Sequence, residues 1–215
     1  MLVLFIGFSG PISSALFLFF VPVKTDPSYI NWRFTNSLLH EIGALALLFL
    51  LLRRQGRKLK DIGLAFHWLD AFKGLALFVV SWVAYYACSA IFQLGYYFWN
   101  QEYFQYRNTD AVFLGVSMVL MTGYSVAAPF FEEILVRGYL MTELIDLSWP
   151  VWLAALASVA FQTSYHLYYG LAGALIVGTG FAISAIYFAV WRRLWPVILS
   201  HLIWDVLATY RHFHH

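Results

Sequence analysis

The sequence predicts an all-α fold, a polytopic bundle of about seven transmembrane helices. Of its 215 residues, 62% are hydrophobic and only 11% are charged, whereas soluble domains of this size carry about 25% charged residues. The apolar residues form seven runs, each near or above the roughly 20 residues that a helix needs to cross a bilayer. This composition leaves no room for a soluble domain.

The first four runs differ in length and in their polar residues. The first resembles a secretory signal peptide, but it lacks a basic leading region and a clear cleavage site, so we expect a retained helix. The second is short, and its His40 and Glu41 lie near its start, where polar groups are tolerated at the membrane interface. The third and fourth exceed an upright span and should tilt or protrude. The expected helices are residues 1–23, 36–52, 70–98, 111–146, 150–169, 172–191 and 195–210.

The later helices follow turn-forming residues. Ser148 and Pro150 predict a tight turn before the fifth helix, with Ser148 as its N-cap, and Pro196 stands in the first turn of the seventh. No internal repeat is visible. We expect one integrated membrane domain, in which residues 1–110 form the N-terminal helices and residues 111–215 form a core that holds the main polar clusters.

Charge placement gives an expected orientation. The basic link RRQGRKLK, residues 53–60, predicts a cytoplasmic loop by the positive-inside rule. Counting seven spans places Arg192 and Arg193 on the same side, with Lys24 and Arg33 opposite, the N-terminus inside and the C-terminus outside. The net charge of +2 gives no reason to expect a nucleic-acid partner, and the single Cys88 excludes an internal disulfide and a cysteine-based metal site.

The run FFEEILVRGYL, residues 130–140, places charges inside an otherwise apolar helix. Glu133 and Arg137 are four residues apart, in the favourable order for a helical ion pair. Glu132 is rotated by about 100° from Glu133 and points elsewhere. Unpaired charge at such depth costs several kcal/mol, so Glu132 is a candidate general base. The structural alternative is an ion pair at a helix end near the headgroups.

His166 is the second intramembrane group. It shares a helix face with Gln162, four residues earlier. Pro150 lies 18 residues after Glu132 and 16 before His166, so an antiparallel hairpin rising about 1.5 Å per residue allows them to meet. Alone, a histidine among tyrosines is more often a packed interfacial residue.

His201 and Asp205 form the third cluster and again share one helix face. Asp205 can hold His201 in one tautomer, or act as a ligand or hydrogen-bonding group itself. The alternative is a self-satisfied pair kept for packing specificity. By the seven-span count, His166 lies near the outer end of its helix and His201 near the inner end, so they meet only through tilt or a shifted boundary. We assign no chemistry to the terminal His212, His214 and His215.

The three motifs in this order resemble the CAAX protease and bacteriocin-processing (CPBP) family of intramembrane proteases, which includes type-2 CAAX prenyl endopeptidases and bacterial Abi proteins. The resemblance covers about residues 110–210. Glu132, Glu133 and Arg137 match EExxxR, His166 matches the histidine of FxxxH, and His201 with Asp205 matches HxxxN/D. Gln162 departs from the family's phenylalanine; because that residue packs rather than reacts, we expect the change to be tolerated.

This resemblance implies an intramembrane endopeptidase, metallo- or glutamate-dependent, that acts on a membrane-associated substrate such as a prenylated CAAX protein or a peptide precursor. It implies catalytic roles for Glu132, Glu133, His166, His201 and Asp205. Glu132 would activate water that His166 helps to hold, and His201 and Asp205 would stabilise the oxyanion. Arg137 would hold Glu133. A Zn²⁺ cofactor stays open, since these side chains include metal ligands but no HExxH motif is present.

Two other functions remain open from the residues. The same fold could serve as a non-catalytic membrane scaffold or a bacteriocin-immunity protein. An ion-coupled carrier is a third class, disfavoured because no repeat is visible and these polar groups are confined to the C-terminal half. We expect an integral protein of a prokaryotic inner membrane, in contact with the lipid bilayer.

Overall fold

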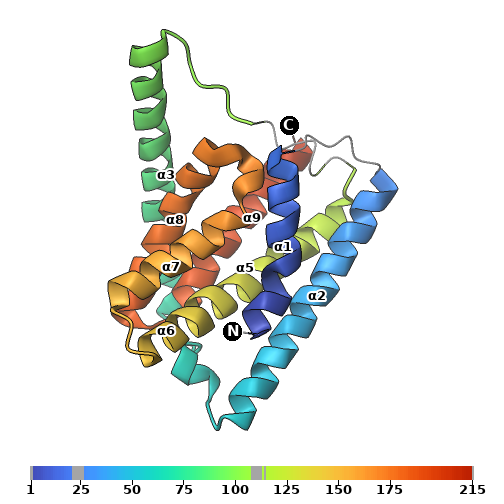
Figure 1. Ribbon diagram of the computed structural model, residues 1–215, viewed down its shortest axis with the longest axis vertical. Helices are drawn as coiled ribbons and strands as arrows, with labels where there is room; N and C mark the ends of the chain where they lie inside the picture. Colours follow the sequence, from blue (N-terminus) through green and yellow to red (C-terminus); the bar gives the residue numbers. More distant parts are fainter. Residues whose placement is uncertain (1, 21–26, 108–112, 114, 215) are drawn as a thin grey trace.

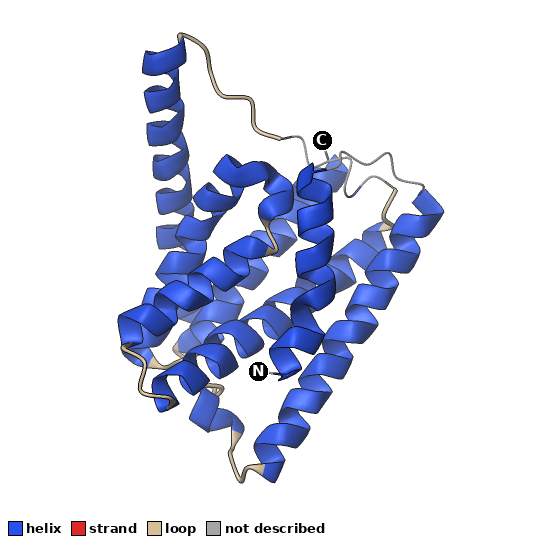
Figure 2. Ribbon diagram, viewed as in Figure 1, coloured by secondary structure: helices blue, strands red, loops and turns tan. Residues whose placement is uncertain are grey.

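The computed structural model describes residues 2–20, 27–107, 113 and 115–214, and the predicted orientation of Lys24 and the terminal His215 fall outside them. Helices account for all the regular structure in these residues, and they contain no strand (Figure 2). The predicted all-α class is therefore confirmed.

The helices follow the seven predicted runs, with short additional turns. Five helical stretches within the described residues are long and apolar enough to cross a membrane, whereas α7 is apolar but only 14 residues long. In chain order the elements are α1 (Leu2–Phe20), α2 (Pro27–Arg54), η1 (Leu59–Ile62), α3 (Asp70–Asn100), α5 (Met118–Glu133), the π-helix η2 (Ile134–Met141), α6 (Thr142–Asp146), α7 (Val151–Ser164), η3 (Leu167–Tyr169), α8 (Gly170–Trp191) and α9 (Trp195–His214).

The helices depart from the sequence prediction mainly in three respects. The second helix begins at Pro27 rather than at residue 36. The fourth run changes from α to π geometry at Ile134, and its predicted start at residue 111 lies outside the described residues. The fifth helix ends at Ser164 rather than at residue 169, so His166 lies in the turn between α7 and η3.

The predicted turn before α7 is present, but Ser148 is not the N-cap. Ser148 adopts a left-handed conformation with φ of 67°, and its backbone N–H donates to the carbonyl of Ile145. An N-cap residue normally has extended backbone geometry, and here Pro150 takes that position without a side-chain cap.

The longer α2 changes the surroundings of Glu41. The buried face of this helix includes Glu41, Ala44, Leu48 and Leu52, with the three- and four-residue spacing of one helical face. Glu41 is only 4% exposed, whereas the neighbouring His40 is exposed and contacts the carbonyl of Ile6. The expectation that Glu41 lies at the end of a span was therefore wrong, because the helix begins well before it.

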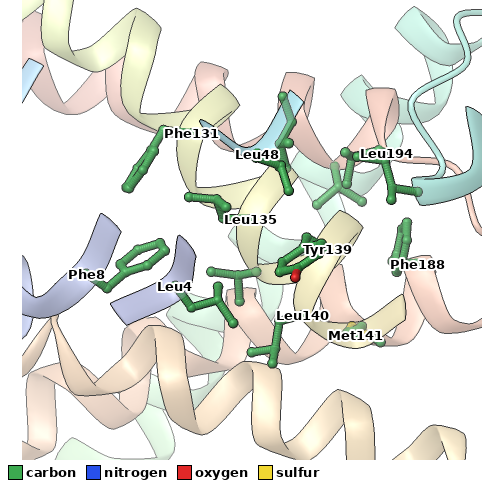
Figure 3. Packing of buried hydrophobic residues seen from close by; sticks show 14 of the residues in the cluster. Leu4, Phe8, Leu48, Phe131, Leu135, Tyr139, Leu140, Met141, Phe188 and Leu194 are labelled. Atoms are coloured by element: carbon green, nitrogen blue, oxygen red, sulfur yellow. The ribbon is translucent and has the colours of Figure 1, made fainter. Parts of the chain in front are cut away.

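The π-helix η2 lies in the centre of the bundle. All eight of its residues are buried. Figure 3 shows Leu135, Tyr139, Leu140 and Met141 of η2 among side chains from α1, α2, α8 and the link before α9. This position explains how Arg137, in the middle of η2, comes to be fully buried.

The helices pack with marked differences in tilt. α5 and α7 cross the bundle obliquely, while α3 extends beyond the other helices at one end (Figure 1). α3 packs against α8 and α9, α5 packs against α2 and α9, and α7 packs against α8 and η2. The oblique α5 and α7 thus carry their ends into the middle of the bundle.

The basic links lie together at one end. The backbone N–H of Leu194 donates to the carbonyl of Gly63 at 3.0 Å, and Arg193 binds Asp70. Arg57, in the link after α2, pairs with Glu143 and Asp146 of α6. When seven helices alternate in direction, every second link lies at the same end of the bundle, as the links after α2, α6 and α8 do here.

The outward faces of the helices are apolar. Only 11% of the most apolar 18-residue stretch of α3 is buried, and large side chains such as Val79, Val83 and Ile91 are exposed. Surfaces of this kind are unstable in water but match the hydrocarbon of a bilayer. With helices of spanning length, they identify an integral membrane protein.

Candidate active site

The site residues come from three places that the fold brings together. Glu132 and Glu133 end α5 where the π-helix begins, His166 follows the end of α7, and His201 and Asp205 lie on α9. π-helical segments inside longer helices are frequent at functional sites.

Glu133 is the most enclosed acid of the group. Its Oε2 lies 3.3 Å from Arg137 Nε, the contact that the four-residue spacing predicts. Its Oε1 accepts a 2.8 Å hydrogen bond from His201 Nδ1 and a longer one, 3.4 Å, from Gln162 Nε2. The two side chains of the ion pair are 1% and 0% exposed, so each depends on the other for charge compensation.

Arg137 also anchors the site to α8. Its Nη2 donates to the carbonyl of Phe181 at 3.1 Å, and its guanidinium carbon lies 5.6 Å from the centre of the Phe181 ring. The sequence prediction that Arg137 holds Glu133 is thus matched by geometry, and the same side chain fixes the position of α8.

Glu132 points away from this ion pair. Its Oε2 accepts hydrogen bonds from Gln162 Nε2 at 2.9 Å and from the Tyr165 hydroxyl at 2.8 Å. In the described residues its Oε1 accepts none. Glu132 is only partly buried. Two neutral donors hold its Oε2, and its Oε1 is left to bind another group.

His166 is held by its own helix end and by aromatic rings. Its Nδ1 lies 2.9 Å from the carbonyl oxygen of Gln162, which can only accept, so Nδ1 carries the proton. In the neutral form of this ring, Nε2 is then unprotonated and can accept a hydrogen bond. The rings of Tyr165 and Phe181 each lie 4.8 Å from the imidazole, centre to centre, and fix its orientation.

His201 lies between two carboxylates. Its Nδ1 bonds to Glu133, and its Nε2 lies 3.6 Å from Asp205 Oδ1, an ion-pair distance too long for a hydrogen bond. The group that orients His201 is therefore Glu133, whereas the sequence offered Asp205 as one candidate for this role. A doubly protonated imidazole satisfies both neighbours.

The site residues differ in exposure. The side chains of Arg137 and Glu133 are closed off, that of His201 is 11% exposed, and that of Asp205 is 30% exposed. Glu132 and His166 are also partly buried, so the ion pair of Glu133 and Arg137 is the enclosed part of the site and the other groups lie closer to its surface.

Hydrogen bonds and ion pairs connect these residues into one network. Gln162 links Glu132 to Glu133, and Glu133 links to His201, which faces Asp205. His166 joins through the Gln162 carbonyl. Among the described residues no direct hydrogen bond joins Glu132 to His166. The ring of Phe181, whose centre is 6.4 Å from that of His201, contacts the histidines from both α9 and the α7–η3 turn.

The donor set does not form a metal site in this arrangement. Within the part of the chain that the structure describes, no three His, Cys, Asp or Glu side chains are grouped to hold a metal ion. The chemistry agrees, because Arg137, His201 and Gln162 already occupy the oxygens of Glu133. No step of the reaction is therefore assigned to a metal ion.

Sequence reasoning missed three members of these surroundings. Gln162 was interpreted as a tolerated packing change, but it binds both acids; Tyr165 was not considered as a donor. Glu41 was placed at the interface, although it is buried and lies within the electrostatic influence of Glu132 and Asp205. An amide and a carboxylate within largely apolar helices were the available clues.

The comparisons with known proteins concern the C-terminal segment. Residues 114–207 match the family model described as type II CAAX prenyl endopeptidase Rce1-like. The match covers somewhat less than half of the chain and includes every site residue named from the sequence. It confirms the resemblance to CPBP proteases that the three motifs indicate. No curated protein and no solved structure matches the chain.

Proposed function

From the Rce1-like segment at residues 114–207, we propose that this membrane protein is an intramembrane endopeptidase of the CPBP type, with a membrane-associated protein or peptide as substrate. The observation that carries the proposal is the state of Glu132. Two donors fix its Oε2, while its Oε1 is left without a partner in the described residues, which is the arrangement that a positioned general base requires.

Glu132 and His166 would hold the attacking water between them. Glu132 Oε1 accepts one proton of the water, and the unprotonated Nε2 of His166 accepts a hydrogen bond from the other. With both protons directed toward the protein, a lone pair of the water oxygen faces the substrate carbonyl.

His201 would stabilise the developing charge. With Nδ1 bound to Glu133, its Nε2–H faces the more exposed Asp205 and can donate to the carbonyl oxygen. Asp205, at ion-pair distance, favours the charged imidazole. Buried Arg137 keeps Glu133 in place and touches no reacting atom.

The proposed reaction balances in two steps. The water oxygen bonds to the carbonyl carbon while one water proton passes to Glu132. The π electrons of the carbonyl move to its oxygen, which becomes an oxyanion that accepts a hydrogen bond from His201. The intermediate then collapses: the carbon–nitrogen bond breaks, and Glu132 returns the proton to the leaving amine. The products are a carboxylic acid and an amine, and Glu132 is restored.

Substrate and setting follow from the family and the surface. A prenylated CAAX-type protein or a peptide precursor would reach the site from the bilayer or its interface. A prokaryotic inner membrane is the setting we propose for the protein.

The test is Glu132→Gln, which preserves shape and removes the base. We expect peptide cleavage to fall by at least the ~10²–10⁴-fold typical of general base catalysis, with expression and folding unchanged. The protein is reconstituted in liposomes with a library of membrane-anchored peptides, including prenylated and unprenylated forms, and cleavage is followed by mass spectrometry.

Two further outcomes decide between alternatives. If wild type cleaves no member of the library but binds a partner or confers bacteriocin immunity in cells, the scaffold function replaces the protease. Loss of cleavage with a chelator, restored by Zn²⁺, would add a metal to the mechanism, whereas insensitivity supports water activated by Glu132 alone.

A further inference from the structure

Gln162 lies on the buried face of α7. That face consists of Ala154, Ser158 and Gln162, at four-residue spacing, and all three are fully buried. The small residues at the first two positions let α7 approach the π-helix η2 closely, and the two elements pack together. The longer Gln162 follows at the end of this face, where it reaches the acids at the α5–η2 junction.

A single amide group of Gln162 contacts both acids. Its Nε2 donates to Glu132 Oε2 at 2.9 Å and to Glu133 Oε1 at 3.4 Å. Its backbone carbonyl also accepts from His166 Nδ1 at 2.9 Å. One residue therefore touches three of the candidate catalytic groups, and it sets both the carboxylate orientation of Glu132 and the tautomer of His166.

The neutrality of this donor is chemically significant. Adjacent carboxylates repel each other, and Glu133 already has Arg137 as its counter-ion. A cation at position 162 would separate the acids equally well, but it would also stabilise the charge on Glu132 and weaken it as a base. An amide fixes Glu132 without adding charge.

Gln162 has one unused atom. Its Oε1 is buried and has no hydrogen-bond partner among the described residues. Buried amide oxygens in proteins nearly always have a partner. A residue present only to fill space would meet this requirement better as the apolar side chain that the resembled motif has at this position.

We infer that Gln162 is a positioning residue of the reaction: its neutral amide holds Glu132 in the orientation that presents Oε1 to water. This inference rests on the proposed function. Tyr165 is the second donor to the same oxygen, so the two side chains act together on Glu132.

The experiment compares Gln162→Leu, Tyr165→Phe and the double variant in proteoliposomes, with the peptide that wild type cleaves best. We expect Gln162→Leu to lower kcat by about 10- to 100-fold, as loss of a hydrogen bond to a charged group does, with KM within about twofold of wild type. Tyr165→Phe should lower kcat less, and the two changes together should be non-additive because they act on one atom.

Two measurements separate positioning from a structural role. Ser158→Ala removes a buried hydroxyl from the same face of α7, one without a hydrogen-bond partner in the described residues, and should leave kcat unchanged. In the Glu132→Gln background, Gln162→Leu should cause no further loss of residual cleavage.

The inference is overturned if Gln162→Leu retains wild-type kcat, or if it lowers residual cleavage equally in the Glu132→Gln background. It is also overturned if Ser158→Ala and Tyr165→Phe reduce kcat to the same extent as Gln162→Leu. If wild type cleaves nothing and Glu132→Gln changes nothing, the proposed function itself fails, which is a different result from an active enzyme that is indifferent to Gln162.

Discussion

Arg137 shows how much one residue can determine in this bundle. Its guanidinium is fully buried, compensates the charge of Glu133, and binds the Phe181 carbonyl of α8. In a low-dielectric interior, removing one member of such a pair strands the other, and this costs more than the pair itself contributes.

Arg137→Ala should therefore lower the free energy of unfolding by about 3–5 kcal/mol. It should also lower activity. Arg137→Lys keeps the charge and should lose less. Thermal unfolding in detergent measures both variants, with the exposed Arg53→Ala as control. Wild-type stability of Arg137→Ala would contradict a buried Glu133–Arg137 pair.

At the scale of the element, α2 carries an acid where the rest of its buried face is apolar. Glu41 faces the Tyr124 hydroxyl of α5, and the charges that act on it, from Glu132 and Asp205, have its own sign. Among the residues that the structure describes, its Oε2 has no hydrogen-bond partner and no cation forms an ion pair with it. Burial of a carboxyl group in this way costs stability.

Glu41→Gln should accordingly raise the unfolding temperature, because the amide keeps a hydrogen-bonding group for Tyr124 and carries no charge. A gain of about 1 kcal/mol would correspond to about 2–4 °C for a chain of this size. The exposed Glu102→Gln should leave the unfolding temperature unchanged. A fall in stability on replacing Glu41 would show that its carboxylate is paired.

At the scale of the whole molecule, contacts between the basic links hold several helices together at one end of the bundle. Asp70 at the start of α3 is fully buried, and Arg193 between α8 and α9 binds both of its oxygens, at 2.9 and 2.7 Å. The Arg193 side chain is 30% exposed, so this pair is intermediate between a surface pair and a buried one.

Asp70→Asn should destabilise the protein by more than the ~1 kcal/mol of a surface ion pair and by less than the ~3–5 kcal/mol of a fully buried one. Asp146→Asn is the matched control, since Asp146 pairs with Arg57 at 3.3 Å but is 60% exposed, and it should change stability little. Equal unfolding temperatures for the two variants would mean that burial of Asp70 adds nothing.

The sequence by itself determined the all-α class, the seven helical runs and the identity of the polar clusters. These follow from properties that are local in the chain: apolar length, proline and serine at turns, and the four-residue spacing that pairs Glu133 with Arg137. The three ordered motifs, EExxxR, the His166 motif and HxxxD, indicated a resemblance to CPBP proteases, and the hairpin count about Pro150 predicted that Glu132 and His166 could share one region.

Only the tertiary structure decided how these groups are connected. Gln162 bridges the two acids because small residues let α7 approach η2, and Glu133 rather than Asp205 orients His201 because α9 packs against α5. Glu41 is buried because it lies on the face of α2 that includes Ala44, Leu48 and Leu52, and Arg137 is enclosed because α5, α6 and α7 pack against the π-helix and α8 contributes Phe181. Spacing along a chain fixes which side chains share a helix face, whereas contacts between faces depend on the tilt and separation of different helices, which no local pattern encodes.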